Sequence, residues 1–391
     1  MKLMSLFDGS GGFPLAASLC GIKPIYAAEV EPYPIAVTKN RFPKMKHLGD
    51  VSKVKGGEIE PIDIITFGSP CQDMSIAGKR AGLKHADMGD DETTRSGLFL
   101  EAIRIIKEMR EATNGVYPRY AIWENVPGAF SSNRGEDFRT VLEEFIRVKE
   151  KDVVMPSVPA AGWPYADCYS GNGWSLAYRV FDAQYWGVPQ RRRRIYLVAD
   201  FRGERAKEIL FERKGLRGDI EESRTHGQET ARCAKNSVGT AIGGVDRYNQ
   251  SFLSGLAQTL RASGGGDCIP TVLAPVGKEK TVAVPVHYIV RRLTPTECAR
   301  LQGFPDLWGY LDKKESFTDE EYKFWLEVRN TYARINNKAV KDYTKAQMLS
   351  WYNKLHSDSA EYKMWGNGIA LPNALYVMQG IAEVVGVHHS K

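Results

Sequence analysis

The chain has 391 residues, enough for two or three domains, and 43% of them are hydrophobic, which supports a sizeable core. Its net charge of +6 is compatible with a polyanionic partner without identifying one. The six cysteines include no CxxC pair, so neither a zinc site nor a disulfide framework is expected. No stretch approaches the ~20 apolar residues of a membrane span, and an acid interrupts the amino terminus before a secretory core forms. We therefore expect a cytoplasmic protein in a reducing compartment.

The amino-terminal segment predicts a ligand cradle. Residues 2–7 are expected to form a strand, residues 8–13 a glycine-rich turn and residues 14–20 an apolar helix. Glycines let the backbone approach a ligand, and the helix N-terminus offers free N–H groups. The turn does not match GxGxxG, so a dinucleotide fingerprint is not met. A second strand, 25–30, carries Glu29 near its end, where an acid can accept hydrogen bonds from ribose hydroxyls; this favours a nucleoside ligand over a purely structural turn.

Two further strands end in residues that can carry chemistry. The apolar run 62–68 leads into Ser69-Pro70-Cys71-Gln72, which places a cysteine where α/β sheets position their active sites. For Cys71 alone, a buried structural thiol is an equal alternative, because reactivity depends on exposure and pKa. The strand within 120–127 brings Glu124 to its carboxyl end, where apolar surroundings would raise the pKa and suit proton donation. A helix cap or a surface acid is the alternative for Glu124.

The segment 190–199 runs from four consecutive arginines into an apolar strand. Such a run is usually a solvated face or a nucleic-acid patch. Alternation along a strand sends Arg192 and Arg194 to one face and Arg191 and Arg193 to the other. Two of the four arginines can therefore point into a site.

Six blocks of the sequence, taken together, resemble the C5-cytosine-specific DNA methyltransferases and occur in that family's order. The blocks are Phe7-Asp8-Gly9-Ser10-Gly11-Gly12, Gly68-Ser69-Pro70-Cys71-Gln72, Glu124-Asn125-Val126, Gln190-Arg191-Arg192-Arg193-Arg194, Arg292-Leu293-Thr294-Pro295 through Leu301-Gln302-Gly303-Phe304-Pro305, and Gly366-Asn367-Gly368. The resemblance implies an α/β fold with a mostly parallel, doubly wound, Rossmann-like sheet. A smaller target-recognition domain and a helical insert would accompany this sheet.

The resemblance implies methyl transfer from S-adenosylmethionine to carbon 5 of cytosine within a specific sequence of duplex DNA. Cys71 would be the nucleophile that adds to carbon 6, a covalent step that turns carbon 5 into an enamine-like nucleophile. Glu124 would hold and protonate N3, Arg194 would hold the ring carbonyl oxygen, and Arg192 would help to position the cysteine loop. No metal is expected, because the sulfonium donor is already electrophilic.

The same resemblance implies a donor site and a mobile lid. The implied donor-binding residues are Phe7, Gly9, Gly11, Glu29, Asp50, Pro70 and Asn367. Asp8 departs from many relatives, which have a small apolar residue here, and it adds a charge near the donor. The target base must leave the duplex, and the segment 72–94, with Gly78, Gly82 and Gly89 as hinges, is expected to be the lid that completes the site.

Target recognition is expected between residues 201 and 305. By composition, the Gly-, Ser- and Thr-rich stretch 236–275 is also typical of a linker. The candidate DNA-contacting residues are Arg95, Arg247, Tyr248, Gln250 and Arg261. Arg and Gln can pair with guanine and adenine edges, but each of these side chains is individually more typical of a phosphate or structural contact.

The region after the recognition segment is expected to be helical. Thr294 and Glu297 predict a capping box, and further boxes are expected at Thr318 and Thr344 within a helical insert. The insert carries a stripe of aromatic side chains, which we expect to be local core rather than a DNA-contacting surface. An apolar helix over 366–387 is expected to return to the first domain. The expected division is a catalytic domain of residues 1–200 plus 366–391, a target-recognition domain of 201–305 and an insert of 306–365.

Two other functions stay open from the sequence. One is cytosine methylation in RNA, since a relative of this family acts on transfer RNA, and the other is a DNA-binding homologue without activity. The recognition-like region argues for DNA, and intact Cys71, Glu124 and Arg194 argue for an enzyme. Methylation of an amino group is not favoured, because those enzymes generally use an Asp/Asn-Pro-Pro-aromatic loop and no cysteine nucleophile. We expect a monomer that acts on duplex DNA, with any cognate restriction endonuclease acting separately.

Overall fold

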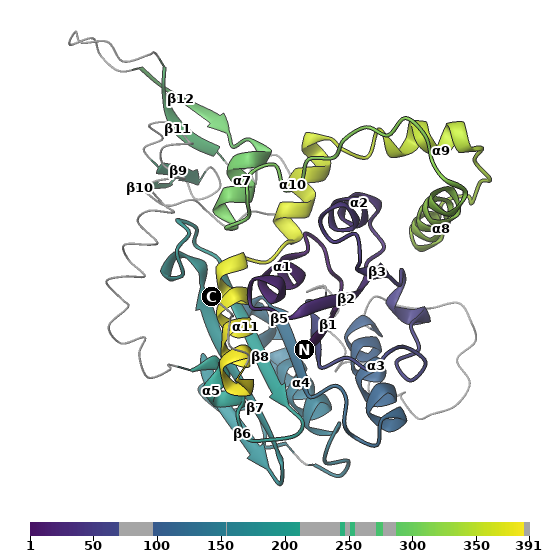
Figure 1. Cartoon of the computed structure of the whole chain (residues 1–391). Coiled ribbons are helices and arrows are strands. Elements are labelled where there is room, and N and C mark those ends of the chain that lie inside the picture. The colour runs from purple at the N-terminus through teal and green to yellow at the C-terminus, as the bar shows by residue number, and fades with distance from the viewer. Residues whose placement is uncertain are drawn as a thin grey trace.

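The computed structural model describes residues 1–69, 97–153, 155–211, 243–246, 251–254, 271–276 and 287–386 (Figure 1). Its centre is an eight-stranded sheet with the strand order β3-β2-β1-β4-β5-β8-β7-β6. The strands are β1 (Lys2–Leu6), β2 (Lys23–Ala28), β3 (Lys46–His47), β4 (Ile64–Phe67), β5 (Tyr120–Asn125), β6 (Ala166–Gly171), β7 (Trp174–Asp182) and β8 (Arg193–Asp200).

The sheet is mostly parallel, as the sequence predicts. Strands β3, β2, β1, β4 and β5 pair in parallel, and helices supply the crossovers that parallel neighbours need. The remaining strands β8, β7 and β6 pair antiparallel to their neighbours, an arrangement that the sequence pattern did not reveal. Strand β2 ends at Ala28, so Glu29 follows the strand instead of lying within it.

Helices cover both faces of the sheet, which makes the fold doubly wound. One face carries α1 (Gly12–Leu19), α2 (Pro32–Arg41), α5 (Ala206–Leu210) and α11 (Leu371–Val385), and the other carries α3 (Leu98–Ala112) and α4 (Glu136–Ile146). Short 3-10 helices are η1 (Val51–Lys53), η5 (Pro127–Phe130), η6 (Ser132–Gly135) and η7 (Ala183–Tyr185).

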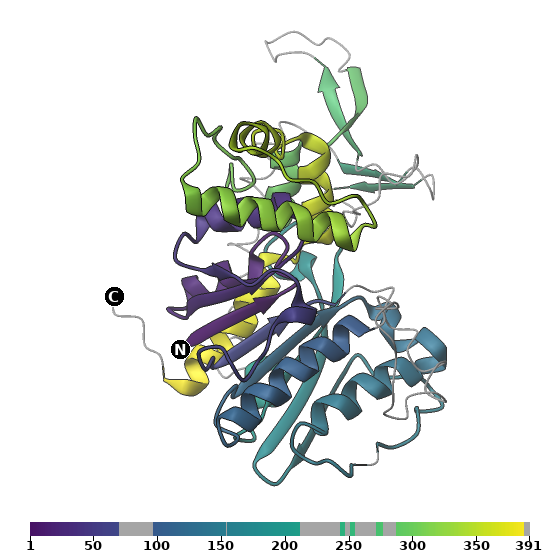
Figure 2. The same ribbon diagram turned by 90° about the vertical axis from the view of Figure 1, so that its right-hand side faces the viewer.

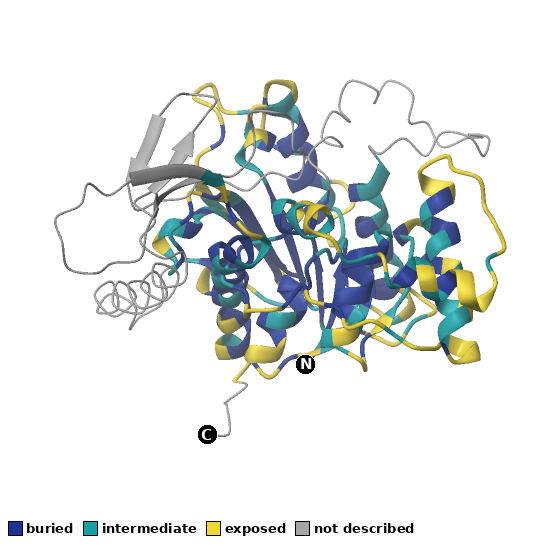
Figure 3. Ribbon diagram, turned by 90° about the horizontal axis from the view of Figure 1, so that it is seen from above, coloured by how far each residue is buried: buried dark blue, intermediate teal, exposed yellow. Residues whose placement is uncertain are grey.

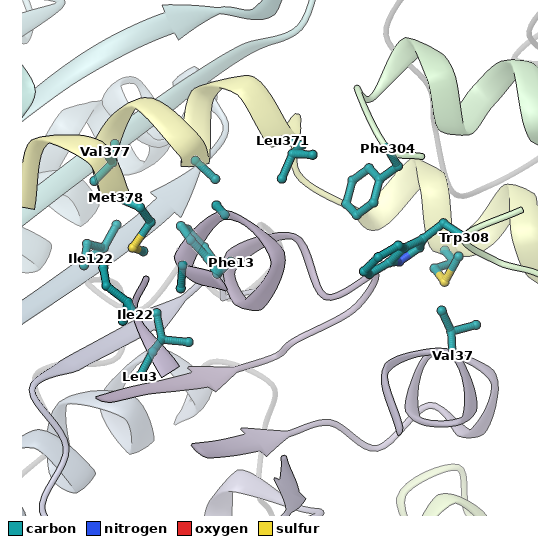
Figure 4. Close-up of a cluster of buried hydrophobic side chains, with 14 of the residues drawn as sticks. Leu3, Phe13, Ile22, Val37, Ile122, Phe304, Trp308, Leu371, Val377 and Met378 are labelled. Carbon is teal, nitrogen blue, oxygen red and sulfur yellow. The ribbon is translucent and has the colours of Figure 1, made fainter. Parts of the chain in front are cut away.

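Strand alternation explains how one sheet supports two cores. Leu3 and Ile122 face the cluster that contains α1 and α11 (Figure 4), whereas Met4 and Trp123, their neighbours in sequence, face the cluster under α3 and α4. The central strands β1, β4 and β5 are therefore buried on both faces, as the dark blue strands in Figure 3 show, whereas the edge strand β6 is partly exposed.

A second, four-stranded sheet lies in the region expected for target recognition. Its antiparallel strands follow the order β10-β9-β11-β12. They are β9 (Gly243–Asp246), β10 (Ser251–Ser254), β11 (Thr271–Val276) and β12 (His287–Arg292). The stretch 236–275 thus contains strands, which a simple linker would not.

Helices α7 (Pro295–Leu301), α8 (Asp319–Ile335), α9 (Lys345–Tyr352) and α10 (Asp358–Asn367) follow. The three predicted capping boxes are present at the starts of α7, α8 and α9. Trp325 and Tyr352 are buried, so the aromatic stripe does form core, but that core is continuous with the one around α2. Figure 2 shows the insert helices beside the amino-terminal part of the catalytic sheet.

The prediction of a single apolar helix over 366–387 is wrong about where that helix begins. Helix α10 ends at Asn367, and α11 begins at Leu371 with Pro372 in its first turn. Within the described part of the chain, no single helix is long and apolar enough to cross a membrane, and α10 and α11 pass that test only as a pair bent by 46°.

Candidate active site

The carboxyl ends of the central parallel strands meet at one edge of the sheet. Open α/β sheets bind their ligands at this edge. The segments that leave the strands here carry Asp8 after β1, Glu29 after β2, Ser69 after β4 and Glu124 at the end of β5. Sheet topology therefore gathers side chains that the sequence separates widely.

Glu124 and Arg194 form the centre of this edge. Strands β5 and β8 are antiparallel with Glu124 opposite Tyr196, and Arg194, two residues before Tyr196, lies on the same face. The Nε atom of Arg194 is 3.1 Å from Oε1 of Glu124, and the two side chains are only 12% and 10% exposed. Within the described residues, Oε1 of Glu124 has no hydrogen-bond partner. The pair therefore offers a carboxyl oxygen and a guanidinium to a polar ligand.

The pKa of Glu124 reflects two opposing effects. Burial of the carboxyl raises its pKa above the ordinary value, and the positive charges of Arg194 and Arg192 oppose that rise. Burial is the larger effect, so Glu124 holds a proton more readily than an exposed glutamate does. This is the property that proton donation to a ring nitrogen requires.

The end of β4 is tied to the end of β5 beside Glu124. The Nε1 atom of Trp123 donates a hydrogen bond to Oγ of Ser69 at 3.2 Å, and Nδ2 of Asn125 donates one to the backbone oxygen of Ser69 at 3.1 Å. A Cβ atom at Gly68 would lie 3.1 Å from Oε2 of Glu124, so this glycine leaves room for the carboxyl group. The residue two positions before Cys71 is thus anchored next to Glu124.

Arg192 is almost completely buried, whereas Arg191 and Arg193 are exposed, so neighbours in the arginine run lie on opposite faces as predicted. Its backbone N–H donates to Oδ1 of Asp182 at 2.9 Å. Its Nη2 atom donates to the backbone oxygen of Gly366 at 3.3 Å and to that of Gly368. Arg192 therefore connects the start of β8 to the segment between α10 and α11, while its proposed role at the cysteine loop stays a prediction.

Glu29 is held by the glycine turn and by its own backbone. The N–H of Gly9 donates to Oε2 of Glu29 at 2.8 Å, and the N–H groups of Val30 and Glu31 donate to Oε1 at 2.8 and 2.9 Å. Burial raises the pKa of Glu29, and these three N–H groups oppose that rise. The acid predicted to bind ribose hydroxyls is therefore oriented before any ligand arrives.

The turn itself has a backbone that glycine makes possible. Gly9 and Gly11 have φ values of 54° and 77°, in the left-handed region, and Phe7 also has a positive φ of 55°. A Cβ atom at Gly11 would lie 2.8 Å from Cγ2 of Thr38, so a larger residue there would displace α2. The three turn residues predicted to line the donor thus occupy a tight and conformationally unusual loop.

Asp8 lies within this turn and is 7% exposed. Neither of its carboxyl oxygens has a hydrogen-bond partner among the described residues. Burial raises the pKa of Asp8 to about 8. The nearby hydroxyl of Ser5 opposes this rise in pKa, although the two side chains form no hydrogen bond of good geometry. The negative charge of Glu29 raises the pKa of Asp8 further. Asp8 is therefore a mostly neutral acid at pH 7, a property that its identity alone did not indicate.

Asp50 lies at the start of η1, where its side chain accepts a hydrogen bond from the N–H of Ser52 at 3.0 Å. The preceding residues Leu48 and Gly49 line a cavity of about 130 Å³ together with Glu29 and Val30. Asp50 itself is not among the lining residues, so its predicted contact with adenine stays a prediction.

Asn367 is exposed at the last position of α10. The neighbouring Gly368 packs against the glycine turn, since a Cβ atom there would lie 2.9 Å from Oγ of Ser10. The carboxyl-terminal segment therefore reaches the donor turn, but the Asn367 side chain makes no hydrogen bond within the part of the chain that the structure describes, and its role stays a prediction.

The other candidate residues lie outside the described part of the chain. They are Cys71 of the catalytic set, Pro70 of the donor set, and Arg95, Arg247, Tyr248, Gln250 and Arg261 of the DNA-contacting set. The expected lid, 72–94, also lies outside it. Their roles stay predictions.

Three hydrogen bonds that the sequence did not reveal connect the glycine turn and α2 to residues 308–309. The indole N–H of Trp308 donates to the backbone oxygen of Ser10 at 2.8 Å, and Nε of Arg41 donates to the backbone oxygen of Trp308 at 3.0 Å. The hydroxyl of Tyr33 donates to the backbone oxygen of Gly309 at 2.6 Å. The only sequence signal was the block that ends at Pro305, because a tryptophan a few residues later has no local pattern that reveals its partner.

The residues present fit a nucleoside donor. The turn offers a close backbone approach at Gly9 and Gly11, and Glu29 stands beside a cavity at the end of β2. Among the residues that the structure describes, no group of three or more His, Cys, Asp and Glu side chains is placed to hold a metal ion.

Comparison with known proteins agrees with this geometry. The sequence model of the C-5 cytosine-specific DNA methylases matches residues 1–149 and 212–324, more than half of the chain. The type II methyltransferase M2.BsuMI of Bacillus subtilis (strain 168) is 27% identical over 94% of this chain and 82% of that protein. A protein of Escherichia phage P1 named DNA N-6-adenine-methyltransferase is 26% identical over 97% of this chain. This chain spans 61% of the length of the phage protein.

Structural comparison extends the likeness to the whole fold. The crystal structure of the S. pombe Dnmt2 methyltransferase matches with a TM-score of 0.55 and 16% sequence identity, covering 98% of this chain and 99% of that one. At this identity the likeness shows the fold alone. The match to the family model over residues 1–149 and 212–324 places this chain in the family of C-5 cytosine-specific DNA methylases.

Proposed function

We propose that the protein methylates carbon 5 of cytosine within a specific sequence of duplex DNA, by covalent catalysis at Cys71 on a base turned out of the helix. Membership of its family supports cytosine-5 methyl transfer with S-adenosylmethionine as the donor. The observation that carries the finer proposal is the buried pair of Glu124 and Arg194 beside the anchored Ser69.

Cys71 is the proposed nucleophile because of where its strand ends. Two peptide units separate it from Ser69, so their Cα atoms are at most about 7 Å apart. Ser69 is itself hydrogen-bonded to Asn125, the residue after Glu124. A thiolate at Cys71 and the Glu124 carboxyl can therefore reach one pyrimidine ring.

The proposed reaction has three stages: addition of Cys71 to the ring, methylation of carbon 5, and elimination of Cys71. The Cys71 sulfur forms a bond to carbon 6 while Glu124 delivers a proton to N3, and the displaced electron pair makes carbon 5 nucleophilic. Carbon 5 would then form a bond to the methyl group while that group's bond to the sulfonium sulfur of the donor breaks, which would leave S-adenosylhomocysteine. Loss of the carbon 5 proton to solvent, expulsion of the Cys71 thiolate and return of the N3 proton to Glu124 restore the aromatic ring and both catalytic groups. Arg194 holds the ring carbonyl oxygen and keeps Glu124 in place.

The donor is proposed to lie along the glycine turn. Gly9 and Gly11 allow close approach of the backbone, and Glu29 accepts hydrogen bonds from the ribose hydroxyls. Phe7, Asp50, Pro70 and Asn367 complete the proposed set, in line with the resemblance of their blocks to the family. The base must be extruded before reaction, and loss of stacking and pairing costs a few kcal/mol.

The decisive experiment uses duplex DNA with 5-fluorocytosine. Fluorine cannot leave as a cation, so the final elimination is blocked and the enzyme stays attached to the ring. With S-adenosylmethionine, the wild-type protein should form an adduct that survives denaturing electrophoresis, and Cys71→Ala should form none. An adduct of equal yield with Cys71→Ala would refute the assigned nucleophile. Bisulfite sequencing of DNA from cells expressing the protein supplies the target site for this duplex.

Two other substrates are tested by the same preparation. The name of the phage P1 relative points to adenine, although this chain leaves a large part of that protein unmatched. RNA stays an alternative, because a relative of the family acts on transfer RNA. Mass spectrometry of digested nucleosides should find 5-methylcytosine in DNA and neither N6-methyladenine in DNA nor 5-methylcytosine in transfer RNA. We propose further that the protein acts as a monomer in the cytoplasm, where a thiolate stays reduced, with any cognate endonuclease separate.

A further inference from the structure

The insert helix α8 lies against the end of the sheet where the donor is proposed to bind. The cavity of about 130 Å³ is lined on one side by residues of the catalytic sheet, among them Glu29 and Gly49, and on the other by Phe324, Val328 and Thr331 of α8. A water molecule takes ~30 Å³ of the liquid, so the cavity can hold a group of several heavy atoms.

Helix α8 is held at this place by packing that extends through the insert. Lys39 of α2 lies 4.4 Å from the ring centroid of Phe324, and the ring of His47 meets the same ring edge to face at 6.4 Å. On the next residue, Trp325 is buried and packs on Tyr352 of α9 at 4.8 Å. The wall of the cavity is therefore a rigid part of the fold rather than a loose surface helix.

His47, which lines the cavity, has a buried ring nitrogen without a partner among the described residues. The hydroxyl of Thr38 donates to the backbone oxygen of Pro34 at 3.0 Å, so its oxygen accepts from Nε2–H of His47 at 3.3 Å. The other ring nitrogen, Nδ1, is then an acceptor, and it is buried with no hydrogen-bond partner within the described chain. Burial and the nearby charge of Lys39 lower the pKa of His47 to about 4, so the ring is neutral at pH 7. A buried acceptor of this kind suits the amino group of a purine.

We propose that α8 of the insert forms the outer wall of the pocket for the donor's adenine, with Phe324 and Val328 covering the base. No sequence motif in this stretch points to such a role, and the donor residues implied by the family resemblance all lie outside the insert. The inference rests on the proposed donor site at Glu29. It makes the insert part of donor binding instead of an independent module.

The test is the affinity for S-adenosylhomocysteine, measured by titration calorimetry. Val328→Phe places extra volume in the cavity and should weaken binding tenfold or more. Lys323→Phe adds the same ring at an exposed position of the same helix and should bind as the wild type does. Wild-type affinity in Val328→Phe would overturn the inference.

A second measurement does not depend on whether Val328→Phe folds. In the wild-type protein, saturating S-adenosylhomocysteine should slow amide hydrogen exchange over 319–335, and unchanged exchange across α8 would overturn the inference. The donor assignment fails separately. The proposed donor site is wrong if the wild type does not bind S-adenosylhomocysteine, or if Glu29→Ala binds it as well as the wild type does. Only the role of α8 is wrong if Glu29→Ala weakens binding and Val328→Phe does not.

Discussion

The Nε atom of Arg194 lies 3.1 Å from Oε1 of Glu124, across two strands that run in opposite directions. The two side chains form an ion pair and are largely buried. Oε1 nevertheless accepts no well-aligned hydrogen bond within the described residues. A buried acid without full hydrogen bonding is costly unless a ligand completes it. An ion pair of this kind is therefore typical of a binding site that is completed by its substrate.

Glu124→Gln should slow methyl transfer by about 10² or more, because a positioned general acid typically contributes 10²–10⁴. The amide keeps the shape of the side chain, and the residue is not part of the donor turn. Single-turnover rates at saturating DNA measure the chemical step, and calorimetry measures S-adenosylhomocysteine affinity. An equal fall in donor affinity would place Glu124 in the wrong role.

The pH dependence of the chemical step should follow Glu124. Its pKa is raised by burial, so methyl transfer should decline as the pH rises through that raised pKa and the acid loses its proton. Arg194→Gln removes a positive charge that favours the ionised carboxylate, so the pKa rises further and the alkaline limb should move to higher pH. The measurement is the rate of methyl transfer from pH 5 to 10 at saturating substrates for the wild type and Arg194→Gln. An alkaline limb that moves to lower pH in Arg194→Gln would contradict the assigned effect of Arg194 on the pKa of Glu124.

Asp8→Asn should change how stability depends on pH. The ordinary pKa of this acid is 3.8 and burial raises it to about 8, so the folded state binds the extra proton between these values. Wild-type stability should therefore fall, relative to Asp8→Asn, from about pH 4 to about pH 8 and stay lower above that. Each unit of pKa corresponds to ~1.4 kcal/mol, so the difference reaches several kcal/mol. Urea unfolding at four pH values measures it, and parallel profiles for the two proteins would show that Asp8 is not buried as a neutral acid.

Arg192→Met should lower the free energy of unfolding by about 2–4 kcal/mol, because it removes the Arg192 donor from the buried backbone oxygen of Gly368 and the half-buried one of Gly366. Arg191→Met changes the exposed neighbour in the same run and should stay within about 0.5 kcal/mol of the wild type. Thermal and urea unfolding of both variants provide the comparison. Equal stability of the two would mean that Arg192 does not connect β8 to the α10–α11 segment.

Much of this fold could be predicted because its signals are local. The capping boxes at Thr294, Thr318 and Thr344 were visible as residue pairs three positions apart, and each begins a helix. The alternation of the arginines indicated that two of the four would share a face, and the family resemblance indicated Arg192 and Arg194. The antiparallel direction of β8 could not be predicted, because a strand's sequence carries its own periodicity but not the direction of its neighbour.

The sequence by itself determined the family of this protein and the side chains available for its chemistry. A glycine turn, an acid after a strand and an arginine run can each be recognised from a few neighbouring residues. The tertiary structure alone decided that Arg194 meets Glu124, that Trp308 holds the turn at Ser10, and that α8 lies over the cavity beside Glu29. The physical reason is that these contacts join positions far apart in the chain. Strand register and the packing of side chains bring them together, and neither can be read from the residues on one side of a contact.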